Sequence, residues 1–97
     1  MTHGKNLNSA QHQLLLTLLR KVRTERGVTQ EQLSLRIGMQ QSDISKVERG
    51  VRRLDVLELR IWLSGLDLPL SSFVDELEVE LNRHNMLVIQ ASGKRKN

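Results

Sequence analysis

Residues 29–50 read TQEQLSLRIGMQQSDISKVERG, and the spacing within this stretch decides the fold. Its apolar residues predict two short helices joined by a tight turn. Thr29 precedes Gln32 with the spacing of a capping box at the start of the first helix. Leu33 and Ile37 then fall on one apolar face of that helix.

The second helix of this stretch has a narrow apolar stripe. Gly38 favours the end of the first helix, and the second begins near Gln40 or Gln41. Only Ile44 and Val47 are apolar, so most of its circumference is free. The free face carries amides, hydroxyls, an ammonium and a guanidinium, which match base edges and phosphates in a major groove. A solvated surface helix is the alternative interpretation.

This pattern resembles the phage-repressor (Cro/XRE) helix-turn-helix family over about residues 14–77. The matching positions are Thr29-Gln30, Leu33, Ile37-Gly38, Gln41-Ser42, Ile44-Ser45, Val47-Glu48-Arg49-Gly50 and Arg52-Arg53-Leu54-Asp55. One position departs, because Gln40 stands where family members often have Ser or Thr, which are better N-caps. The resemblance implies an all-α, five-helix, lambda-repressor-like domain that binds duplex DNA.

The resemblance also implies which side chains reach the bases. It places Gln41, Ser42 and Lys46 toward base edges, with Gln40 at the entrance of the groove. A Gln amide pairs with adenine and a Lys ammonium donates to guanine. Asp43 has two interpretations: it accepts from cytosine, or it is a favourable charge on the first helical turn.

A second group of side chains is expected at the phosphates. The resemblance implies a phosphate contact for Gln30, and helix N-terminal N–H groups point the same way. Three guanidiniums around Gly50 are typical of phosphate clamps, although a solvated loop is the alternative. Glu48 is expected to have a structural role, paired with Arg36. The expected phosphate contacts are Thr29, Gln30, Ser45, Arg49, Arg52 and Arg53.

Composition argues against catalysis. The chain has 97 residues and no cysteine, and its three histidines lie far apart in the sequence. No clustered ligating groups and no phosphate-binding glycine loop are present, so we expect no enzyme, no catalytic residue, no metal site and no cofactor. No apolar run has the length of a membrane span, and a cytoplasmic location is expected.

Charge is unevenly distributed along the chain. Residues 1–66 carry a net +5, residues 67–83 carry −4 and residues 84–97 carry +3, giving the total of +4. A basic body with one acidic segment predicts that one face of the domain binds a polyanion. A different face is then turned away from the polyanion. Only Trp62 and Phe73 are aromatic, so stacking on unpaired bases is poorly supported.

Helices are expected on both sides of the central stretch. Residues 1–8 predict a disordered arm, and Ser9 can cap a first helix over about residues 10–25. Asp55 and Glu58 form another capping box. The apolar stripe of the first helix is Leu15, Leu18, Leu19 and Val22, and that of the helix after the box is Val56, Leu59, Trp62 and Leu66, with Leu57, Ile61 and Leu63 as additional apolar residues.

A glycine and a proline mark the last part of the domain. Gly65 stands where a close helix contact favours a small residue. Pro69 can start the last helix, expected over about residues 70–81. The apolar stripe of this helix is Leu70, Phe73, Val74, Leu77 and Leu81.

The C-terminal part suggests self-association. Residues 86–90 are largely apolar and predict a short strand, which has no partner inside an all-helical domain. The same strand of a second copy would supply one, so a homodimer is favoured; a segment lying on its own core is the alternative. The DNA-binding domain is then residues 9–83, and residues 84–97 are an extension that ends in a basic tail.

These observations together favour a bacterial or phage transcriptional regulator. A dimeric repressor would set two second helices in successive major grooves of a near-palindromic operator. The sign of regulation follows from the family resemblance alone. Two alternatives remain: an antitoxin that grips a toxin through its C-terminal apolar surface, and a protein-interaction module that has lost DNA binding.

Overall fold

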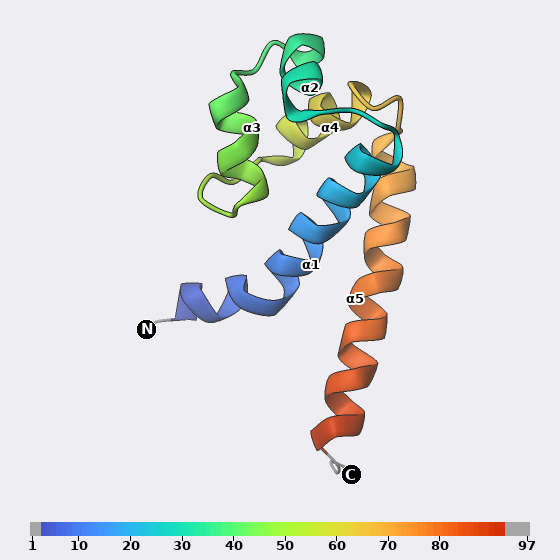
Figure 1. Ribbon diagram of the computed structural model, residues 1–97. Helices are drawn as coiled ribbons and strands as arrows, with labels where there is room; N and C mark the ends of the chain where they lie inside the picture. Colours follow the sequence, from blue (N-terminus) through green and yellow to red (C-terminus); the bar gives the residue numbers. More distant parts are fainter. Residues whose placement is uncertain (1–2, 93–97) are drawn as a thin grey trace.

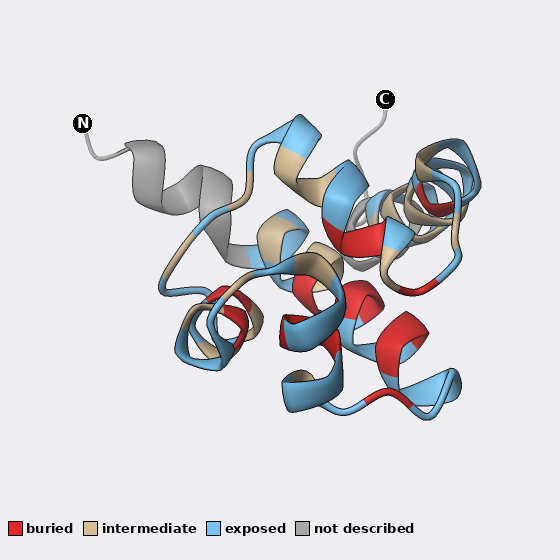
Figure 2. Ribbon diagram, turned by 90° about the horizontal axis from the view of Figure 1, so that it is seen from above, coloured by how far each residue is buried: buried red, intermediate tan, exposed pale blue. Residues whose placement is uncertain are grey.

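The computed structural model describes the backbone of residues 3–92 and the side chains of residues 10–85. These residues form five α-helices and no strand, which confirms the all-α prediction (Figure 1). The helices are α1 (His3–Glu25), α2 (Gln30–Ile37), α3 (Gln41–Glu48), α4 (Val56–Ser64) and α5 (Leu70–Ser92). In Figures 1 and 2, α3 and α5 lie on opposite sides of the molecule.

Two capping boxes fix where α2 and α4 begin. The hydroxyl of Thr29 accepts from the backbone N–H of Gln32 at 3.0 Å, and the Gln32 side chain accepts from the Thr29 N–H at 2.9 Å. Asp55 and Glu58 make the same pair of bonds at 2.7 and 3.0 Å. Gly38 ends α2 with φ of 71°, a left-handed conformation that costs glycine little. The local signals in the sequence are therefore confirmed.

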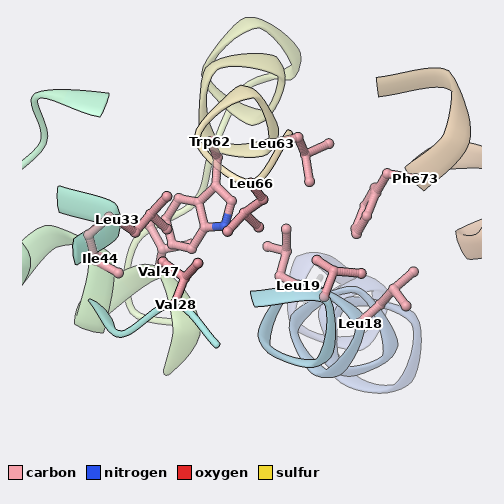
Figure 3. Close-up of a cluster of buried hydrophobic side chains, with 11 residues drawn as sticks. Leu18, Leu19, Val28, Leu33, Ile44, Val47, Trp62, Leu63, Leu66 and Phe73 are labelled. Atoms are coloured by element: carbon pink, nitrogen blue, oxygen red, sulfur yellow. The ribbon is translucent and has the colours of Figure 1, made fainter. Parts of the chain in front are cut away.

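The hydrophobic core is joined through α4, which buries side chains on two sides. Trp62 lies beside Leu33 of α2 and Val47 of α3, whereas Leu63 lies on the side of Phe73 of α5 (Figure 3). Consecutive residues on a helix point in directions about 100° apart, so one helix can serve both parts of the core. Leu63, one of the additional apolar residues outside the expected stripe, is fully buried in this core.

Gly65 allows α2 and α4 to approach closely, as its position predicted. A Cβ atom at this position would lie 2.6 Å from Ile37 Cγ2 and 2.8 Å from Leu33 Cδ1. The Arg36 guanidinium adds a second link between these segments, because Nη1 donates to the carbonyl of Gly65 at 2.9 Å. This contact fixes α2 against the end of α4.

Two of the predicted apolar stripes each include a residue that is exposed to solvent. Val56 is 61% exposed and Val74 is 43% exposed, so neither belongs to the core. Both lie on the edge of their stripe, where a helix that packs on one side leaves side chains in water. Figure 2 shows the resulting arrangement, with buried segments facing inward and exposed segments outward.

The first helix begins earlier than the sequence suggested. α1 begins at His3 rather than Ala10, so the prediction of a disordered arm is wrong for residues 3–8. Nothing between Gly4 and Ser9 blocks helical hydrogen bonding, because no proline occurs there. Residues 1 and 2 lie outside the described part of the chain.

The last helix continues well beyond its expected end. α5 runs from Leu70 to Ser92, and the strand predicted over residues 86–90 is wrong because these residues are helical. No glycine or proline interrupts the chain between Leu70 and Ser92, so the intrahelical hydrogen bonds continue. The domain division between residues 83 and 84 stays a prediction, and residues 93–97 of the basic tail lie outside the described part.

Candidate nucleic-acid interface

The exposed face of α3 is held outward by two buried side chains. Ile44 is fully buried and Val47 is 1% exposed, and they anchor the helix to the core. The structure leaves four predicted base-contacting side chains exposed on the other side: Gln40, Gln41, Ser42 and Lys46. An eight-residue helix with two anchors thus presents an almost continuous polar surface.

The N-terminus of α3 lacks a side-chain cap. Gln40 takes the extended N-cap conformation, with φ of −67° and ψ of 145°, but its amide makes no capping hydrogen bond. The first N–H groups of the helix are left for another acceptor, and a helix N-terminus carries partial positive charge. Asp43 lies half-buried in the first turn, which is compatible with both of its interpretations.

A buried ion pair joins the end of α3 to α1. The Nε and Nη2 atoms of Arg23 donate to the two carboxylate oxygens of Glu48 at 2.7 and 2.9 Å. Arg23 Nη1 donates to the carbonyl of Val28 at 2.7 Å. The side chains of Arg23 and Glu48 are only 8% and 3% exposed, so both charged groups are shielded from water. Such a paired geometry offsets the large cost of burying two charges.

The expected structural role of Glu48 is correct, but its expected partner is wrong. Glu48 pairs with Arg23, while Arg36 is engaged with the Gly65 carbonyl. Arg23 was not among the residues predicted for this site. A signal was present, because Arg23 stands four residues after Leu19 and therefore falls on the buried stripe of α1.

The start of α2 is connected to the same carboxylate. Gln30 Nε2 donates to Glu48 Oε1 at 3.0 Å, which fixes the amide beside the N-terminus of α2. The second N–H of this amide can still donate to a phosphate. The Thr29 hydroxyl accepts the capping bond and keeps its own proton to donate. Both predicted phosphate contacts are therefore positioned by internal hydrogen bonds.

The three arginines after α3 differ in their surroundings. Arg49 is exposed, and its Nε donates to the hydroxyl of Ser45 at 3.2 Å. Arg52 is half-buried and pairs with Glu58 through Nη2 and Oε2 at 3.0 Å. Arg53 is exposed. Gly50, with φ of 81°, supplies the turn that brings this loop back toward α4.

His12 was not expected near this interface, and no sequence signal indicated it. Burial and then the positive charge of Arg53 hold the pKa of His12 below its ordinary value. Because Arg53 belongs to the loop after α3, the N-terminal half of α1 is electrostatically coupled to the predicted phosphate-binding loop.

Comparison with known proteins agrees with this geometry. A family model described as helix-turn-helix matches residues 19–73, more than half of the chain. An XRE-family-like protein from Pseudomonas syringae pv. tomato str. DC3000 is 35% identical, with a TM-score of 0.73 and coverage of 82% of this chain and 98% of that one. The chain belongs to the XRE helix-turn-helix family, whose members are DNA-binding transcription regulators.

Solved controller proteins are similar over a comparable length. The wild-type restriction-modification controller protein C.Esp1396I is 29% identical, with a TM-score of 0.69, covering 75% of this chain and 96% of that one. The same controller was solved as a tetramer in complex with its natural 35 base-pair operator, at 29% identity, a TM-score of 0.68 and coverage of 74% and 95%. No curated relative matches the sequence.

The family is one of regulators rather than an enzyme class. Within the described residues, no helix has both the length and the hydropathy that a bilayer crossing requires. The same residues contain no group of three or more side chains suited to hold a metal ion.

Proposed function

We propose that this chain is a dimeric transcriptional repressor that binds a near-palindromic operator. Two copies of α3 would lie in successive major grooves, about 34–36 Å apart on one side of the duplex. Repression would be steric, because a dimer spanning both half-sites covers the DNA that polymerase needs. The related controller bound to its operator supports this mode of binding.

One observation carries the proposal, namely the exposed polar face of α3 above its two buried anchors. We assign base contacts to Gln40, Gln41, Ser42 and Lys46 because these side chains are exposed and carry base-reading groups. We assign phosphate contacts to Thr29, Gln30, Ser45, Arg49, Arg52 and Arg53 around them. Glu48 accepts from both Arg23 and Gln30, which fixes Gln30 and the end of α3 relative to each other.

The proposed dimer rests on the length of α5. Its described core residues are Leu70, Phe73 and Leu77, and none of residues 78–85 is fully buried. Figure 1 shows the helix continuing away from the body. A helical segment with no fully buried side chain gains little stability from its own chain, so a second copy would supply a partner.

The decisive experiment is a selection of bound duplexes from a random-sequence pool at about 0.15 M salt, near physiological ionic strength. We expect an enriched inverted repeat whose half-site spacing matches one helical turn or a multiple of it. Folded protein that enriches no sequence would refute specific operator binding. An enriched single, unrepeated half-site would refute the dimer.

Variants of single contacts test the assignment of each residue. Gln41→Ala or Lys46→Ala should flatten sequence preference by about 1–3 kcal/mol. Arg53→Ala should weaken binding to all duplexes alike and reduce the salt dependence. A changed sequence preference in Arg53→Ala would show that bases and phosphates have been assigned wrongly.

A second candidate function is an antitoxin that also regulates its own operon. Leu57 and Ile61 lie one turn apart on α4 and are 68% and 50% exposed, which favours a protein partner. Co-purification of an unrelated small protein, lost in Ile61→Asp, would support this candidate. A chain that purifies alone from cells expressing its neighbouring genes would refute it.

A further inference from the structure

A cavity of about 270 Å³ lies beside the end of α3 and is lined by α1, the loop before α4, and α4 itself. Most of its wall is apolar, including Leu16 of α1, Val47 of α3 and Leu59 of α4. Polar side chains line it as well, among them His12 and Arg52. A hollow with apolar walls and a few polar groups is the usual form of a small-molecule site, and this volume is near the lower end of the usual range of about 300–1,000 Å³.

Two nitrogen atoms of residues that line this cavity have unmet hydrogen-bonding capacity. His12 Nε2 and Arg52 Nη1 are buried and have no hydrogen-bond partner among the described residues. The nearby carboxylates are engaged elsewhere, since Glu58 accepts from Arg52 Nη2 at 3.0 Å and Asp55 accepts from the Glu58 N–H at 2.7 Å. Unpaired buried polar atoms are costly and uncommon in folded proteins.

One unmet donor indicates the chemistry of the missing group. Asp55 also lines the cavity, and Arg52 is already paired with Glu58, so the summed charge of the lining does not select the ligand. The unmet Arg52 Nη1 is a charged donor, which favours a carboxylate oxygen, and the apolar part of the lining favours a hydrocarbon body. We propose that this cavity binds a small monocarboxylate with an apolar chain, its oxygens at Arg52 and His12 and its chain against Leu16 and Leu59.

Ligand entry requires a small local rearrangement. Both nitrogen atoms are covered by neighbouring groups, so the His12 ring has to turn toward the cavity as the carboxylate arrives. His12 is only half-buried, and side chains with such exposure change rotamer rapidly. The half-buried Arg52 side chain has to shift as well, so that Nη1 reaches the cavity.

Occupancy of the cavity would regulate DNA binding, a part of the inference that rests on the proposed function. Arg52 and Arg53 line the cavity and are also assigned to phosphates. A carboxylate bound beside them would neutralise part of the positive charge that the phosphates meet. We therefore infer that the ligand lowers operator affinity, and that the chain responds to the concentration of a small organic acid.

The first test uses the full chain without DNA. Octanoate is titrated while binding heat and the ¹H–¹⁵N spectrum are recorded. Acetate, which lacks the hydrocarbon chain, and octanamide, which lacks the charge, serve as comparison ligands. Octanoate should bind saturably, at least tenfold more tightly than either, with shifts centred on His12, Leu16 and Leu59. Equal binding of octanamide, or shifts that avoid the cavity, would overturn the site.

Matched variants locate the binding. Val56 lines the cavity and Val51 does not, and the two are similarly exposed at 61% and 66%, so a larger side chain fits at either without disturbing the core. Val56→Phe should weaken octanoate binding at least tenfold, and Val51→Phe should change it less than twofold. Equal effects in both variants would overturn the assignment. His12→Leu should weaken octanoate binding severalfold, because one of the two assigned partners of the carboxylate is lost.

The regulatory part is tested with the operator obtained by selection. Saturating octanoate should weaken operator binding severalfold in the unmodified chain and have no effect in Val56→Phe. Unchanged operator affinity in a chain that demonstrably binds octanoate would refute regulation and leave the site intact. A chain that binds octanoate but enriches no operator would refute the proposed function and not the site.

Discussion

Arg23 connects α1 to the end of α3 and to the segment before α2. Its replacement by Met removes one partner of a buried charge pair and leaves the Glu48 carboxylate unpaired, with its side chain 3% exposed. We expect a loss of about 3–5 kcal/mol in the free energy of unfolding, the usual cost of an orphaned buried charge. Urea denaturation measures this loss directly.

The chain contains its own control for that substitution. Arg83 pairs with Glu80 at 3.0 Å on the surface of α5, where the Arg83 side chain is 63% exposed. Arg83→Met should change stability by at most about 0.5 kcal/mol, because exposed pairs contribute little. Similar losses in the two Met variants would show that burial does not set the importance of Arg23.

His12 should make stability depend on pH. Its pKa is lowered in the folded chain by burial and by Arg53, so the unfolded chain binds the proton more readily. The corresponding stability is present above the ordinary histidine pKa of about 6.5 and is lost as pH falls through the lower, folded value. We expect the free energy of unfolding to fall more steeply below about pH 6.5 in the unmodified chain than in His12→Asn. Parallel pH profiles would contradict this expectation.

Among α2, α3 and α4, α3 has the weakest local start. Gln40 occupies the N-cap position with suitable backbone angles but makes no capping bond, whereas α2 and α4 have complete capping boxes. Gln40→Ser should raise the free energy of unfolding by about 0.5–1 kcal/mol through a new bond to the first turn. Urea denaturation would show this gain, and an unchanged midpoint would indicate that the first turn of α3 is already satisfied by water.

The elements that the sequence predicted best are those with local signals. The box at Thr29 and the glycine at position 38 act within one helical turn, so their pattern could be recognised without knowing the rest of the fold. The lengths of α1 and α5 were underestimated. Where no helix-breaking residue is present, tertiary contacts and solvent determine the residue at which a helix ends. The strand expected over residues 86–90 failed for this reason, since an apolar run of that length suits a strand or a helix turn equally.

Pairings between distant residues were the least predictable part of the site. Exposure of Gln41, Ser42 and Lys46 could be inferred from the narrow stripe of α3. The partner of Glu48 could not, because Arg23 and Arg36 are both basic residues on preceding helices and only packing selects between them. Residue types indicate what a surface can bind, whereas tertiary geometry determines which charges are already engaged.

At the scale of the molecule, the end of α5 provides a test of self-association. A chain that stops after Asn85 keeps all described core residues, the last of which are Phe73 and Leu77. We expect this truncated chain to stay folded but to sediment as a monomer of about half the mass of the full-length dimer. Circular dichroism and sedimentation equilibrium check both parts. An unchanged dimer would show that residues 86–97 are not needed, and residues 78–85 of α5 and the exposed apolar residues of α4 would become the next candidates.

The separation of α3 from the far end of α5 also has a practical consequence. The molecule extends 50 Å along its longest axis, and the two helices lie on opposite sides of it (Figure 1). A fluorescent label or a surface tether attached near the end of α5 would therefore lie far from the groove-reading helix. Operator arrays and single-molecule assays could immobilise the protein at that end and leave the other side open to DNA from solution.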